Sequence, residues 1–151
     1  MKKTLFTATL LAASLMAAST VQAAPQEVTM WHYFDQKPEQ EMLADMVEEY
    51  NSLQDDIHIN ATFVSRTELM NQYTVGALSG ELPDIGQVDS PDMESYISLG
   101  VFEDITDELE SWGELDQFYD GPLSSCKDPD GKVYGLPQNS CLLYTSDAAD
   151  D

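Results

Sequence analysis

The sequence predicts an α/β fold, in which helices cover both faces of a parallel or mixed sheet. Segments with the apolar periodicity of strands and of helices alternate over residues 28–90. Such alternation favours right-handed crossovers between parallel strands. The chain after residue 23 also has the length of a single domain of about 100 to 150 residues. We therefore expect one α/β layer up to about residue 90, followed by a less regular segment.

The elements of this layer follow one another without long gaps. The apolar and aromatic run VTMWHYF (28–34) predicts a buried first strand, and IHINATFV (57–64) alternates like a half-buried strand. The segments PEQEMLADMVEEYNSL (38–53) and RTELMNQYTVGALSG (66–80) have apolar residues at helical spacing, and Gly80 is expected to end the second helix. LPDIGQVDS (82–90) predicts a short third strand.

Three further elements are expected beyond this layer. SPDMESYISLG (90–100) predicts a short helix with Ser90 as N-cap and Gly100 as C-cap. VFEDITDELESWGELDQFY (101–119) predicts an acidic helical stretch. GPLSSCKDPDGKVYGLP (121–137) predicts a β-hairpin that turns at residues 128–131.

The N-terminal residues have the three parts of a secretory signal peptide. Lys2 and Lys3 precede an apolar run at 5–18, and Val21 and Ala23 satisfy the small-x-small rule, so we expect cleavage after Ala23. A membrane anchor is the alternative, but the apolar run is shorter than the roughly 20 residues that a spanning helix needs. We therefore expect a periplasmic protein that does not itself span the membrane.

The charge of the exported chain narrows the range of partners. Without Lys2 and Lys3, four Lys and Arg remain against 28 Asp and Glu, a net charge of −24. Because nucleic-acid binding depends on cations that neutralise phosphates, we expect no nucleic-acid partner. The acidic residues are scattered along the chain, which is typical of a solvated surface rather than of a site for a cationic ligand.

The sequence contains no motif of a familiar catalytic site. A nucleophile elbow, a phosphate-binding loop and a dinucleotide fingerprint are all missing from it, and His32 and His58 lie in different strands without metal-ligand spacing. We therefore expect neither an enzyme nor a bound metal or cofactor. A secreted hydrolase that uses a pair of carboxylates remains the alternative, although acidic residues are too abundant here to single out a pair.

Polar and aromatic residues gather where the predicted strands end, which is where open α/β sheets bind ligands. The aromatic faces and the carboxylates suit a sugar, whose CH surfaces and hydroxyls need both. The candidates from the strand ends are Trp31, Tyr33, Asp35, Arg66, Asp89 and Ser90. For Trp31 packing in the core is an equally good interpretation, and Asp35 and Ser90 could instead cap the helices that follow them.

At this point the chain resembles a known family. The order of these segments is similar to the amino-terminal lobe of the extracellular solute-binding proteins of family 1, the sugar-binding receptors of bacterial ABC importers. The resemblance covers residues 28–140, and its most specific parts are ALSGELPDI (77–85) and DGKVYGLP (130–137). It implies a periplasmic-binding-protein-like lobe at residues 24–140 whose partner lobe would follow along the chain.

The resemblance also implies a function. Members of the family bind a sugar between two lobes that close on it, do not catalyse, and are recognised by the permease subunits of the importer. By this resemblance, residues 31–35, Asp89 and Ser90 match loops that line the sugar cleft, and Gln138 and Asn139 match the segment that enters the hinge. Arg66 lies in a loop that varies among the members of the family. We therefore expect a monomeric receptor that binds a small carbohydrate, in particular an oligosaccharide. We expect it to need no cofactor. A lobe without its partner should bind sugar weakly.

The last eleven residues, CLLYTSDAADD (141–151), depart from the family pattern at Cys141. They are similar to the translation of a transposon adapter used in sequencing libraries, so we expect a non-native tail that begins after Ser140. A disulfide between Cys126 and Cys141 and a solvated acidic arm are the alternatives. If Lys127 faces Lys132 across the expected hairpin, however, Cys141 lies about eight residues away from the position opposite Cys126.

Overall fold

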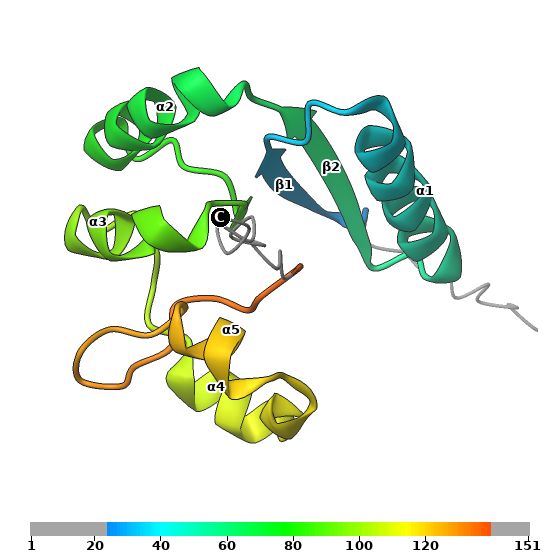
Figure 1. Ribbon diagram of the computed structural model, residues 1–151. Helices are drawn as coiled ribbons and strands as arrows, with labels where there is room; N and C mark the ends of the chain where they lie inside the picture. Colours follow the sequence, from blue (N-terminus) through cyan, green and yellow to red (C-terminus); the bar gives the residue numbers. More distant parts are fainter. Residues whose placement is uncertain (1–23, 140–151) are drawn as a thin grey trace, which may run out of the picture.

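The computed structural model describes residues 24–139 and confirms the α/β class (Figure 1). Its first elements, in chain order, are β1 (Gln26–His32), α1 (Lys37–Leu53), β2 (Ile57–Phe63), α2 (Arg66–Ser79) and β3 (Ile85–Gly86). The three strands form a parallel sheet in the order β2-β1-β3. In Figure 1, α1 lies on one side of the sheet, and α2 and α3 (Met93–Ser98) lie on the other.

The central strand β1 makes very unequal contacts with its two neighbours. It pairs with β2 over seven positions, from Gln26 opposite Ile57 to His32 opposite Phe63. Its pairing with β3 covers only the positions opposite Ile85 and Gly86.

A side-chain contact fastens the start of β3 to β1. One carboxylate oxygen of Asp84 accepts hydrogen bonds from the backbone N–H of Thr29, at 2.8 Å, and from its hydroxyl, at 2.7 Å. These bonds lower the pKa of Asp84, so the carboxylate stays ionised and keeps the contact.

The main core lies on the side of the sheet that α2 and α3 cover. Val64, Leu69, Tyr73 and Tyr96 form a buried cluster, and Tyr73 has no exposed surface at all. Its ring lies edge-on to Tyr96 at 5.2 Å and to Phe102 at 6.0 Å, which is a favourable arrangement for aromatic pairs. The aromatic cluster fixes α2 and α3 against the carboxyl ends of the strands.

The later elements differ from the sequence prediction. A 3₁₀ turn, η1 (Ser90–Asp92), leads into α3, and the acidic stretch after it is not one helix but α4 (Thr106–Trp112) followed by a second 3₁₀ turn, η2 (Leu115–Gln117). Gly113 has a left-handed backbone, with φ 77°, and ends α4, as Gly80 ends α2 with φ 75°. The prediction noted Gly80 but overlooked the same signal at Gly113.

The predicted hairpin is also largely wrong. Its expected first strand contains a short helix, α5 (Asp120–Ser124), and only one antiparallel bridge remains, between Lys127 and Val133. This register differs by one residue from the predicted one, which placed Lys127 opposite Lys132. The turn itself is confirmed: the Asp128 side chain accepts hydrogen bonds from the backbone N–H groups of Asp130 and Lys132, both at 2.9 Å.

Two predictions concern residues outside the described part. The signal peptide at 1–23 and the non-native tail at 141–151 both lie there, and so does Cys141 of the alternative disulfide. Within residues 24–139, no helix is long and apolar enough to cross a membrane.

Candidate functional site

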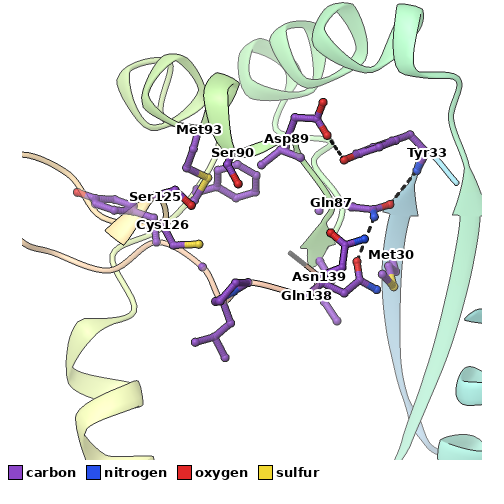
Figure 2. A pocket seen from close by; sticks show the side chains of 18 residues that line it. Met30, Tyr33, Gln87, Asp89, Ser90, Met93, Ser125, Cys126, Gln138 and Asn139 are labelled. Carbon is purple, nitrogen blue, oxygen red and sulfur yellow. Dashed lines mark hydrogen bonds between the residues drawn. The ribbon is translucent and has the colours of Figure 1, made fainter. Parts of the chain in front are cut away.

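A cavity of about 250 Å³ lies where β1 and β3 end and where the segment after residue 133 returns to the sheet (Figure 2). Uncharged hydrogen-bonding side chains and aromatic rings form much of its wall. Its polar lining includes Tyr33, Gln87, Asp89, Ser90, Gln138 and Asn139. In Figure 2, Ser90 lies beside Met93, Ser125 and Cys126, across from Tyr33, Gln87, Gln138 and Asn139.

Gln87 connects the three segments that meet at this cavity. Its side-chain oxygen accepts a hydrogen bond from the backbone N–H of Tyr33, and its side-chain nitrogen donates to the Gln138 side-chain oxygen, both at 3.0 Å. Its backbone N–H donates to the Trp31 carbonyl at 2.9 Å, and its own carbonyl accepts from the Tyr73 hydroxyl at 3.2 Å. Both polar atoms of its amide are therefore used to hold neighbouring chain segments in place.

Tyr33 and Asp89 form one edge of the cavity. The Tyr33 hydroxyl donates a hydrogen bond to Asp89, which also forms an ion pair with Arg66. The Arg66 guanidinium lies over the Tyr33 ring, 5.7 Å from its centroid. Burial raises the pKa of Tyr33 and the nearby Arg66 opposes that shift, so Tyr33 remains a neutral donor at physiological pH.

The segment that carries Gln138 and Asn139 is fastened by contacts far from the sheet. The Val133 N–H donates to the Thr106 hydroxyl, and the Val133 carbonyl accepts from the Ile105 N–H, both at 2.9 Å. These contacts attach the segment to the start of α4. From there residues 135–139 run along the cavity.

The structure brings together five of the eight residues that the sequence predicted for a ligand site. Those that line the cavity are Tyr33, Asp89, Ser90, Gln138 and Asn139. Arg66 does not line it, but it contacts two residues that do. Trp31 and Asp35 line no part of this cavity.

Trp31 follows the alternative interpretation, in which its ring packs in the core. The ring lies 5.4 Å from that of Tyr73, and it packs against the buried cluster around Tyr73. Trp31 therefore takes part in the contact between β1 and α2. It also borders a separate, open hollow beside α2.

The capping alternatives for Asp35 and Ser90 are wrong. The N-cap of α1 is Gln36, and that of η1 is Asp89; neither makes a side-chain capping hydrogen bond. Asp35 is exposed, and its carboxylate accepts a hydrogen bond from the Gln36 side chain at 3.0 Å. Ser90 is the first residue of η1, which places it beside Asp89 at the cavity.

Sequence reasoning missed Gln87, Ser125 and Cys126. Gln87 belongs to the polar turn of LPDIGQVDS, so its place at a strand end was a usable signal. Nothing local in the sequence indicates Ser125 or Cys126, which reach the cavity only because the chain folds back after α5. Burial raises the pKa of the Cys126 thiol, so this side chain is a neutral part of the wall.

The cavity offers hydrogen bonds rather than reactive groups. Among the described residues that line it, Asp89 is the sole carboxylate. In residues 24–139 no group of three or more His, Cys, Asp or Glu side chains could hold a metal ion. Amides, hydroxyls, one compensated carboxylate and aromatic rings suit the recognition of a polyhydroxylated ligand.

Solved structures of sugar-binding proteins of ABC transporters are similar to this chain. The galacto-N-biose/lacto-N-biose I-binding protein of an ABC transporter from Bifidobacterium longum, solved with lacto-N-biose, matches with a TM-score of 0.67 and 26% identity. The match covers 79% of this chain and 30% of that one. The cyclic α-maltosyl-1,6-maltose binding protein from Arthrobacter globiformis matches at 28% identity and a TM-score of 0.52, over 70% of this chain and 24% of that one.

A third match supports the fold alone, because its identity is low. The sugar-binding protein MalE from Xanthomonas citri has a TM-score of 0.66 at 19% identity, over 74% of this chain and 28% of that one. No protein-family model matches the sequence, and no curated protein matches it significantly.

The described residues have the fold of one part of the sugar-binding proteins of ABC transporters. The periplasmic-binding-protein-like lobe expected from the sequence is thereby confirmed as a fold. The chain spans only about 30% of the length of the first of these structures. These neighbours are binding proteins, in agreement with the expectation of a protein that does not catalyse.

Proposed function

We propose that this chain is part of the substrate-binding protein of an ABC importer, and that the cavity at the strand ends forms one wall of a binding cleft for an oligosaccharide. In this proposal the protein is exported by its signal peptide, works in the periplasm as a monomer, and passes the sugar to the permease subunits. Tyr33, Asp89, Ser90, Gln138 and Asn139 contact the ligand, and Gln87 holds several of them in place.

The observation that carries this proposal is the position and chemistry of the cavity. It lies at the carboxyl ends of parallel strands, and Gln87, Ser90, Gln138 and Asn139 supply amide and hydroxyl groups to its wall. Two of the similar structures are of proteins described as binding lacto-N-biose and cyclic α-maltosyl-1,6-maltose.

The size of the cavity supports a shared cleft. Its volume of about 250 Å³ is smaller than the roughly 300 to 1,000 Å³ of ordinary small-molecule sites. An oligosaccharide would therefore need a second wall to cover it. Two-lobed binding proteins provide that wall when they close on a ligand.

The alternative of a secreted hydrolase receives no support from this site. Glycoside hydrolysis by the usual mechanism needs two carboxyl groups that flank the scissile bond. Of the described residues that line the cavity, only Asp89 carries a carboxyl group, and it is paired with Arg66.

A ligand screen on the intact gene product tests the proposal. Thermal shift against neutral oligosaccharides, including lacto-N-biose and maltotriose, should raise the melting temperature for at least one of them, because ligand binding stabilises the folded state. A parallel assay with the same sugars should detect no hydrolysis products. Turnover of a glycoside, or no stabilisation by any sugar in the panel, would contradict the proposed function.

A further inference from the structure

Arg66, Tyr33 and Asp89 form a closed cluster at the edge of the cavity. Arg66 is the first residue of α2, and its guanidinium lies over the Tyr33 ring at 5.7 Å from the centroid. The same group forms an ion pair with Asp89, which accepts the hydrogen bond of the Tyr33 hydroxyl. Each member of the cluster therefore contacts the other two.

The members of this cluster are exposed to different degrees. The Asp89 side chain is 21% exposed and lines the cavity, whereas the Arg66 side chain is 68% exposed and does not line it. A ligand in the cavity would meet the carboxylate and the tyrosine. The cation approaches the same carboxylate from outside the cavity wall.

A half-buried carboxylate without a partner would be costly here. Removing a charge from water is unfavourable unless an opposite charge or hydrogen bonds compensate it. Arg66 and the Tyr33 hydroxyl supply that compensation to Asp89. Because Asp89 is the sole carboxylate among the described lining residues, the pair leaves the cavity wall with little net charge.

We propose that Arg66 is a positioning residue and not a ligand contact. It fixes the orientation of Asp89 and Tyr33 at the cavity, and it cancels the charge of Asp89 so that the site accepts an uncharged sugar and not an acidic one. This inference rests on the proposed function for its ligand, and it replaces the direct contact that the sequence predicted for Arg66.

Calorimetric titration of the intact gene product tests this role with maltotriose and lacto-N-biose as neutral probes. Arg66→Gln should weaken binding of the neutral sugar about fivefold, since a cation–π contact and a largely exposed ion pair each contribute modestly. In a protein that already carries Asp89→Asn, Arg66→Gln should weaken binding of the neutral sugar less than about twofold, because the carboxylate that Arg66 positions is gone. Lys37→Gln removes an even more exposed cation from the remote pair with Glu41 and should leave sugar binding unchanged.

Binding of an acidic sugar tests whether Arg66 cancels the charge of Asp89. Maltobionate should bind the wild type poorly and should bind the Asp89→Asn variant better, because that variant frees the Arg66 guanidinium. If Arg66 contacts the ligand directly, Arg66→Gln costs the same factor with and without Asp89→Asn. That result would overturn the positioning role.

A readout without ligand separates this inference from the proposed function. In NMR spectra of the unliganded protein, the ring signals of Tyr33 should shift in Arg66→Gln and in Asp89→Asn, and should not shift in Lys37→Gln. Unchanged Tyr33 signals in Arg66→Gln would overturn the inference whatever the sugar titrations give. If no sugar of the thermal-shift panel binds the wild type while the Tyr33 signals do shift, the sugar-binding function fails and the positioning of Tyr33 by Arg66 stands.

Discussion

Replacement of Gly86 by alanine should destabilise the fold by forcing Tyr73 out of its place. A Cβ atom at Gly86 would overlap the Tyr73 hydroxyl oxygen, and it would lie 3.1 Å from Cζ of that ring and 3.2 Å from Cε1 of Phe102. Tyr73 is completely buried, and its hydroxyl donates to the Gln87 carbonyl at 3.2 Å. The ring therefore cannot retreat without losing that hydrogen bond.

The expected cost follows from these two effects. Overpacking of a close-packed core typically costs about 1 to 3 kcal/mol, and loss of the Tyr73 hydrogen bond adds about 1 kcal/mol. Gly86→Ala should thus lower the free energy of unfolding by roughly 2 to 4 kcal/mol. Tyr73→Phe alone should cost about 1 kcal/mol, and it removes the oxygen that the new methyl group overlaps.

The double variant decides whether this physical reasoning holds. Gly86→Ala combined with Tyr73→Phe should cost at least about 1 kcal/mol less than the sum of the single changes, since the worst overlap is gone. Gly121→Ala in α5 is the matched control: no heavy atom lies within 4 Å of its added Cβ. It should be neutral or stabilising by about 0.5 to 1 kcal/mol.

Urea unfolding followed by circular dichroism measures all four variants, with the slope checked for a common two-state transition. Strictly additive costs in the double variant would refute the overlap as the cause. A Gly86→Ala protein as stable as the wild type would refute the close approach itself.

Three further predictions concern the site and the pH dependence of stability. Gln87→Ala removes two side-chain hydrogen bonds and should weaken sugar binding about fivefold to tenfold in calorimetry. Burial lowers the pKa of His32 below its ordinary 6.5, so protonation of this side chain opposes folding. The melting temperature should therefore fall as the pH drops from about 6.5 through the lowered pKa. His32→Phe should abolish this fall. The Lys132 ammonium, 2.6 Å from Asp104, and two hydrogen bonds from Thr106 together hold the pKa of the Asp104 carboxyl at about 2. The stability that they contribute is present above the ordinary pKa of 3.8 and is lost as the pH falls through about 2. Asp104→Asn should remove this contribution from acid-unfolding curves.

Each of these three predictions has a matched control and an outcome that would contradict it. Gln117→Ala changes an exposed glutamine in η2 and should leave sugar binding intact; an equal loss there would contradict the role of Gln87. His58→Gln changes an exposed histidine and should retain the pH dependence that His32→Phe removes. A wild-type urea midpoint that does not move between pH 4 and 2, or a loss that is as large in Asp104→Asn as in the wild type, would contradict the contribution of Asp104.

Local pattern was sufficient for the first half of the fold. The spacing of apolar residues predicted β1, α1, β2 and α2 within a few residues, because periodicity along a helix or strand is a property of consecutive residues. The strand ends then indicated Tyr33, Asp89 and Ser90, since the carboxyl ends of parallel strands meet at one edge of the sheet.

The second half was harder because its short helices carry little periodicity of their own. α4, η2 and α5 are each seven residues or fewer, and segments of that length owe their structure to tertiary packing more than to propensity. The single bridge between Lys127 and Val133 likewise leaves no alternating pattern to recognise.

What the sequence determined by itself was the α/β class, the order of the early elements and the edge of the sheet at which polar groups collect. Only the tertiary structure decided what each side chain does there. Trp31 of β1 packs against Tyr73 of α2, and Arg66, the first residue of α2, meets Asp89 just after β3. Contacts between residues far apart in the chain depend on how elements pack, and no local pattern encodes that packing.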